Sequence, residues 1–228
     1  MAAFSSFSNR LPDPNFSIEE TGKGGSGTAG PGFASVKFSS NQPVAFSRTN
    51  SGRVTTRAIA GQNWRIAITY NPMTRDEFEP VYAFLQERRG RLKPFEIVLP
   101  QYNTPRSTVT SSLQADGAVT AGATNFEVKQ ATSGSLRPGD MFTFNDSKVY
   151  QVTRVLTYSD YLTGNRPTDA NHRIYYVTPS VEKTVSDNTP LVYTNPVFRV
   201  IQTSDVVEYS LGTNNLYQFS LTLEEAQP

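Results

Sequence analysis

Strict alternation of apolar and polar side chains in two segments constrains the fold more than any other feature of the sequence. In residues 63–70 and 216–223, every second side chain is apolar. The side chains that share one face are Trp64, Ile66, Ile68 and Tyr70 in the first segment and Tyr217, Phe219, Leu221 and Leu223 in the second. A period of two is that of a β-strand with one buried face. The sequence therefore predicts a mainly β fold with long, half-buried strands.

Other segments with strand character are shorter. They are residues 34–38, 44–48, 54–59, 95–99, 125–129, 141–144, 148–157, 173–178, 191–194, 196–202 and 206–211. Between residues 106 and 195 the strands are short and closely spaced, which is typical of a small barrel or sandwich.

One helix is expected, over about residues 75–89. Thr74 and Glu77 have the T-x-x-E spacing of a capping box, and Gly90 stands where a left-handed residue ends a helix. Its apolar stripe is formed by Phe78, Val81, Tyr82 and Leu85. Pro80 lacks an amide hydrogen, so we expect a kink or a tightened turn there.

These elements predict three parts. Residues 1–32 are rich in glycine and are expected to form a flexible arm, whose Phe4, Phe7 and Phe16 could dock on a partner; a plain disordered terminus is the alternative. Residues 33–105 and 196–228 form a discontinuous core, a split β-sandwich or barrel with one packed helix. Residues 106–195 form an inserted small β-barrel domain.

Charge and composition exclude several classes of protein. The 228 residues carry a formal net charge of +1, so no global field favours nucleic acid or anionic membrane. No apolar run approaches the length of a membrane helix, and the first residues lack the pattern of a signal peptide. There is no cysteine, and His172 is the one histidine, which excludes thiolate and multi-histidine metal sites. We expect no cofactor and no metal.

Motifs that suggest catalysis have simpler explanations. Residues 25–30 match G-x-G-x-x-G, but no strand precedes them and no helix follows, so a linker is favoured over a dinucleotide site. His172 lies in a polar loop, which does not suit the imidazole of a catalytic triad. Asp140 and Asp146 are the acidic pair closest to a glycosidase arrangement, and turn carboxylates are the favoured interpretation. The sequence predicts a protein that is not an enzyme.

Two groups of residues are candidates for binding. The densest basic run contains Arg88, Arg89, Arg91 and Lys93 and is expected to contact acidic residues of a neighbouring subunit. Phosphate is a weaker alternative, because cations at a helix C-terminus are also favoured by the helix dipole. Tyr158 and Tyr161 offer aromatic faces on which a sugar could stack.

Residues 53–99 resemble a known family. The strand N-W-R-I-A-I-T-Y is followed by M-T-R-D-E-F, A-F-L-Q-E-R-R-G and P-F-E-I-V-L-P. This order is similar to that of the minor tail-tip proteins of long-tailed bacteriophages, which are related to the distal tail proteins. Residues 214–225 are similar to the family's last strand, which returns to the same sheet. Residues 139–154 resemble a small β-barrel that is often inserted in tail and baseplate proteins.

The resemblance implies a non-enzymatic virion protein. Such a subunit would form a homo-oligomeric ring, expected to be hexameric, at the distal end of a phage tail. It would link the tail tube protein to hub, baseplate or fibre proteins, after assembly in the host bacterial cytoplasm. Membrane and specific nucleic-acid partners are not expected.

Two other functions stay open. The inserted domain could be a carbohydrate-binding module that contacts host-surface glycan through Tyr158 and Tyr161. A tail-associated hydrolase that uses Asp140 is the less favoured possibility, because no convergent acid and base are apparent.

Overall fold

A computed structural model describes residues 9–13, 17–18, 28–59, 61–144, 146–160 and 166–227. The chain divides into two compact units, Met1–Ile97 with Arg199–Gln227 and Val98–Phe198. The sequence predicts the borders of the inserted domain at 106 and 195, eight and three residues inside the limits of the second unit. A mainly β fold with curled sheets is confirmed, and one α-helix is present in the described part of the chain.

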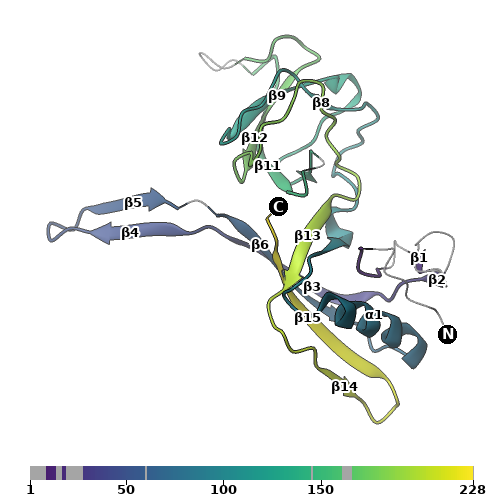
Figure 1. The fold of residues 1–228 in the computed structure, drawn as a ribbon. Coiled ribbons are helices and arrows are strands. Elements are labelled where there is room, and N and C mark those ends of the chain that lie inside the picture. Colours follow the sequence, from purple (N-terminus) through teal and green to yellow (C-terminus); the bar gives the residue numbers. More distant parts are fainter. Residues whose placement is uncertain are drawn as a thin grey trace. The chain divides into compact units, whose positions relative to one another are not determined.

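The first unit is built on one sheet with the strand order β3-β6-β15-β13-β7, and β14 pairs with β15 beside this path (Figure 1). The strands are β3 (Phe33–Asn41), β6 (Asn63–Tyr70), β7 (Phe95–Val98), β13 (Val197–Gln202), β14 (Tyr209–Leu211) and β15 (Tyr217–Glu225). Strands from the two ends of the sequence therefore meet in one sheet.

The two alternating segments are neighbours in this sheet. In the antiparallel register of β6 and β15, Ile68 lies opposite Leu221 and Ile66 lies opposite Leu223. All four side chains are buried. The expected return of the last strand to this sheet is thus confirmed, and the shared period explains it, because both strands present one apolar face to the same core.

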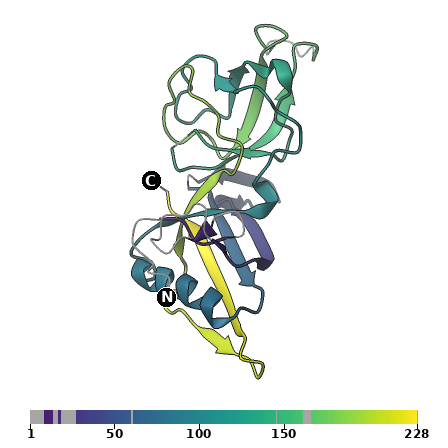
Figure 2. The ribbon, with the colours of Figure 1, turned by 90° about the vertical axis from the view of Figure 1, so that its right-hand side faces the viewer.

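Helix α1 (Arg75–Arg88) packs beside β15 (Figure 2). The backbone amide and the hydroxyl of Thr74 both donate to Glu77 Oε2, at 2.9 and 2.8 Å. The helix passes through Pro80 and ends at Arg89, whose φ is 53°. In the residues that the structure describes, no helix has the length and apolar character needed to span a membrane.

Aromatic rings join the helix to the sheet. Phe78 stacks on Tyr217 with ring centroids 4.5 Å apart and an interplanar angle of 10°. Its other ring neighbours are Tyr82, Tyr209 and Phe219. This cluster fixes one end of α1 against β14 and β15.

Part of the segment expected to be a flexible arm lies in the core of the first unit. The amide of Leu11 donates to the carbonyl of Glu96 at 2.8 Å, and the amide of Glu96 donates to the carbonyl of Asn9 at 2.7 Å. The side chain of Leu11 is fully buried. Two further short strands, β1 (Ser17–Ile18) and β2 (Thr28–Ala29), pair with each other. Phe4, Phe7 and Phe16 lie outside the described residues.

The second unit has a sheet with the order β10-β11-β12-β9-β8. Its elements are β8 (Gln114–Ala115), β9 (Asn125–Lys129), β10 (Met141–Phe142), β11 (Tyr150–Leu156), β12 (Arg173–Thr178) and the 3-10 turns η1 (Pro100–Tyr102) and η2 (Ala131–Ser133). Gln114 on one edge strand bridges Pro190, and Thr143, just beyond the other edge strand, bridges Val192. One segment therefore contacts both edges, which curls the sheet around its own apolar core.

Candidate assembly interface

The first unit contains a two-stranded hairpin that is separate from its main sheet and exposed to solvent. Strands β4 (Val44–Arg48) and β5 (Val54–Ala58) pair with each other, and within the described residues no third strand joins them. The turn is closed by hydrogen bonds between Thr49 and Arg53, and Gly52 adopts a φ of 81°. A glycine suits this turn because a side chain would strain a backbone in that region.

Apolar side chains of this hairpin are exposed to solvent. The side chains of Phe46 and Val44 are 63% and 54% exposed, and those of Val54 and Ile59 are 46% and 52% exposed. Every residue of β4 is exposed. A single hairpin is marginally stable in water, and clustered exposed apolar groups mark interaction sites in folded proteins. The hairpin therefore has the properties of an element that a partner covers.

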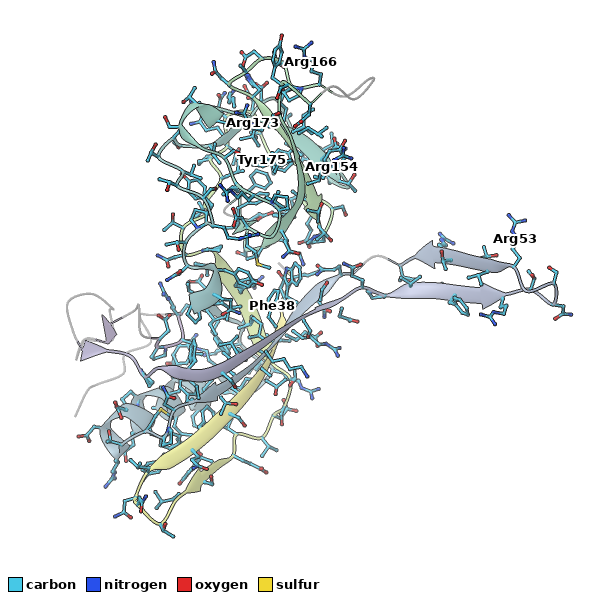
Figure 3. The ribbon with its side chains drawn as sticks, turned by 180° about the vertical axis from the view of Figure 1, so that it is seen from behind. Phe38, Arg53, Arg154, Arg166, Arg173 and Tyr175 are labelled. Carbon is cyan, nitrogen blue, oxygen red and sulfur yellow. The ribbon has the colours of Figure 1, made fainter. Side chains whose placement is uncertain are left out.

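The charge of the hairpin is uniform. Residues 42–62 contain Arg48, Arg53 and Arg57 and no aspartate or glutamate. Figure 3 shows the side chain of Arg53 at the turn of the hairpin. A surface that combines three cations with exposed apolar groups complements a partner surface that is acidic and apolar.

A groove of about 420 Å³ in the same unit has these complementary properties. It lies between β13, β14 and the middle of β15, and its lining includes Val206, Val207, Glu208, Phe219 and Leu221. Val206 is 63% exposed. The carboxylate of Asp205, which lies in the same loop, is 3.7 Å from Nε of Arg91 and 73% exposed. Residues 197–228 carry four acidic side chains and one basic side chain.

The basic run after α1 divides into one buried and three exposed residues. Arg88 is 7% exposed, lies with its guanidinium carbon 4.7 Å from the ring centre of Phe84 and donates from Nη1 to Asn9 Oδ1 at 2.9 Å. Arg89, Arg91 and Lys93 are exposed. The guanidinium of Arg88 therefore makes its contacts inside the first unit. The guanidinium of Arg91 donates to the carbonyl of Thr203 in the same unit.

The tyrosines considered for glycan binding are only partly described. Tyr158 is 39% exposed, and the guanidinium carbon of Arg166 lies 3.6 Å from its ring centre. One face of the ring is thus covered by a cation. Tyr161 lies outside the described residues, so the pair stays a prediction.

The acidic pair considered for hydrolysis stabilises turns. Asp140 is buried and accepts hydrogen bonds from the amides of Arg106 and Arg137, at 2.9 and 2.7 Å. Asp146 accepts a 2.7 Å hydrogen bond from the hydroxyl of Tyr150. Burial raises the pKa of that hydroxyl well above its ordinary value, so it stays a donor. These contacts support the interpretation as turn carboxylates.

Comparison with known proteins identifies what this architecture is similar to. Residues 11–102 match the family described as distal tail protein pb9, A domain, N-terminal. The chain is also 28% identical, over 229 residues, to distal tail protein pb9 of Escherichia phage T5, covering 95% of this chain and 99% of the phage protein. The resemblance to phage distal tail proteins is confirmed. It supports a structural role and a location in the virion tail.

The exposed side chains of the hairpin were not among the residues singled out in the sequence. The sequence does contain a signal for this hairpin. An N-S-G turn separates two alternating segments, and the 21 residues 42–62 contain arginine but no acidic residue. Alternation alone does not show whether the apolar face of a strand is covered by its own chain or by another.

Proposed function

We propose that this chain is a subunit of a closed, six-membered ring at the distal end of a phage tail. The ring would link the tail tube protein to hub, baseplate or fibre proteins, after assembly in the host cytoplasm. The observation that carries the proposal is the basic β4–β5 hairpin, whose apolar residues have no cover within the described chain. The similarity to a distal tail protein supports the same role.

The hairpin of one subunit binds the groove between β13 and β14 of its neighbour. Charge favours this pairing, because Arg48, Arg53 and Arg57 would approach Asp205 and Glu208. Apolar burial favours it too, since Phe46 and Val206 are each 63% exposed in one chain. Because the two surfaces differ, the contact is heterologous, and repeated rotation closes it into a ring.

Paired charge reversals test this proposal. Arg53→Glu or Glu208→Arg alone places like charges at the contact, and each is expected to abolish the ring, as seen by light scattering on a sizing column and by negative-stain images. The double variant restores opposite charges and is expected to recover it. Lys183→Glu reverses an exposed charge of the second unit, outside the hairpin and the groove lining, so it is the matched control and should leave the ring intact. Equal assembly of all four proteins would refute the proposed contact.

Within the described residues, a glycan-binding function of the second unit has no observation in its favour beyond the partial exposure of Tyr158. A glycan array with the unmodified protein and a Tyr158→Ala variant tests it. A signal lost in the variant would add this function to the structural one.

A further inference from the structure

Three side chains of the second unit bring metal-ligating atoms together. One ligand atom each from Asp116, Glu127 and His172 lies within 4.8 Å of the other two. Glu127 is on β9, and His172 directly precedes β12, which pairs with β9 so that Ile174 lies opposite Glu127. The positions are far apart in the sequence, so no spacing motif announces the cluster. Sheet pairing alone brings the imidazole to the carboxylates.

The orientation of the imidazole leaves one nitrogen for a ligand. Nδ1 of His172 lies 2.7 Å from Oδ1 of Asp169. When Nδ1 carries the hydrogen of the imidazole, Oδ1 of Asp169 accepts it. In the neutral imidazole, Nε2 then carries the lone pair. A carboxylate that holds Nδ1 while Nε2 faces a cation is the usual arrangement around zinc-bound histidine.

The distance from Nε2 of His172 to Oδ2 of Asp116 is 3.5 Å. Hydrogen bonds between nitrogen and oxygen are commonly about 2.7–3.2 Å long, so this separation is too long for a good one. Two ligands that each lie about 2.0–2.1 Å from a tetrahedral zinc ion are about 3.4 Å apart. The spacing is therefore that of two ligands of one ion, as well as that of a long ion pair.

The charge around the cluster also favours a cation. Lys129 Nζ contacts Asp187 Oδ1 at 2.9 Å and Asp116 Oδ1 at 3.4 Å, which leaves Oδ2 of Asp116 for a metal. The guanidinium of Arg173 donates to the carbonyls of Ala170 and His172. The carboxylates in the cluster and in direct contact with it are Asp116, Glu127 and Asp169, and Lys129 also pairs with Asp187. The two cations Lys129 and Arg173 do not balance these four carboxylates.

We propose that Asp116, Glu127 and His172 bind one Zn²⁺ ion, with water as the fourth ligand. Mixed imidazole and carboxylate donors suit zinc, whereas calcium and magnesium take oxygen ligands. The ion would link the residue after β8, strand β9 and the loop before β12. Asp169 is a positioning residue that orients the imidazole. The proposal concerns the second unit and does not depend on ring formation.

Because His172 is the one histidine and there is no cysteine, the site can be tested without interference. The full chain, without a polyhistidine tag, is labelled with ¹⁵N and titrated with zinc chloride. The imidazole nitrogens are followed by NMR. We expect one-to-one binding that shifts the Nε2 resonance and leaves Nδ1 protonated. An Nε2 signal that zinc does not move, or a shift of Nδ1 instead, would overturn the proposal.

Calorimetric titration of variants with zinc chloride gives a second measurement. His172→Gln and Glu127→Gln are each expected to weaken binding by about tenfold or more, and Asp169→Asn by about 10- to 100-fold. Glu79→Gln, which changes an exposed carboxylate of the first unit, is the control and should bind as tightly as the unmodified chain. Thermal unfolding without zinc verifies that each variant is folded. Equal binding by His172→Gln would refute the site.

Discussion

Nη1 of Arg88 donates a 2.9 Å hydrogen bond to Oδ1 of Asn9, so the last turn of α1 is joined to a residue near the start of the sequence. Asn9 is in turn paired through its backbone with Glu96 of β7. The guanidinium also lies over the ring of Phe84. Arginine is usually a surface residue, but Arg88 connects α1 to the segment at Asn9 and, through Asn9, to β7.

Replacing this guanidinium should cost stability. We expect Arg88→Ala to lower the free energy of unfolding by about 1–3 kcal/mol, because the hydrogen bond of the buried guanidinium to Asn9 and its packing over Phe84 are lost. Arg89→Ala, at an exposed neighbour, should change it by less than about 0.5 kcal/mol. Urea unfolding of the two variants makes the comparison. Equal effects would contradict a structural role for Arg88.

The stacked rings around Phe78, at the start of α1, should contribute more to the free energy of unfolding than Arg88 does. Phe78 is 2% exposed and contacts four other rings. We expect Phe78→Ala to lower the free energy of unfolding by about 3–5 kcal/mol, since it leaves a cavity between α1 and β15. Phe78→Leu refills much of that volume and should cost less. Differential scanning calorimetry of both variants tests which one is less stable. A smaller loss of stability in Phe78→Ala than in Phe78→Leu would contradict the claim that Phe78 fills the space between α1 and β15.

Alkaline pH should destabilise the second unit through Tyr175. Burial raises the pKa of its phenol to about 12, from an ordinary value near 10. From about pH 10 to 12 the unfolded chain has released this proton while the folded chain keeps it, so the free energy of unfolding falls as pH rises.

The matching variant is Tyr175→Phe. It removes the oxygen that accepts the Leu136 amide at 3.0 Å, so it should be less stable at neutral pH. Between pH 10 and 12 its stability should decline less steeply than that of the unmodified chain. Denaturant unfolding at several pH values measures both slopes. Parallel declines would show that Tyr175 does not titrate in this way.

Local patterns in the sequence predict the strands and the helix well. The period of two in 63–70 and 216–223 reflects burial of one face, and the capping box at Thr74 reflects backbone amides that need acceptors. The packing of residues 9–13 was not predictable in this way. Leu11 stands between polar residues and prolines, so its burial depends on a backbone pairing with Glu96 that no local period encodes.

The candidate site was predicted only in part. A run of cations after a helix signals exposed charge, and three of its four residues are exposed, but it does not show that Arg88 lies over Phe84. The hairpin has an ordinary strand pattern, and its exposure follows from the lack of a third strand. The approach of His172 to Asp116 and Glu127 likewise requires the sheet register.

Disulfide cross-linking tests the ring most directly, because the natural chain contains no cysteine. A variant with Phe46→Cys and Val206→Cys carries one thiol on the hairpin and one in the groove, both at exposed positions. After oxidation, the proposed contact predicts a ladder of covalent oligomers that ends at a closed six-subunit species, measured by denaturing electrophoresis and mass photometry. Each single-cysteine variant, as the control, can form no more than a dimer. Monomers alone from the double variant would contradict the account.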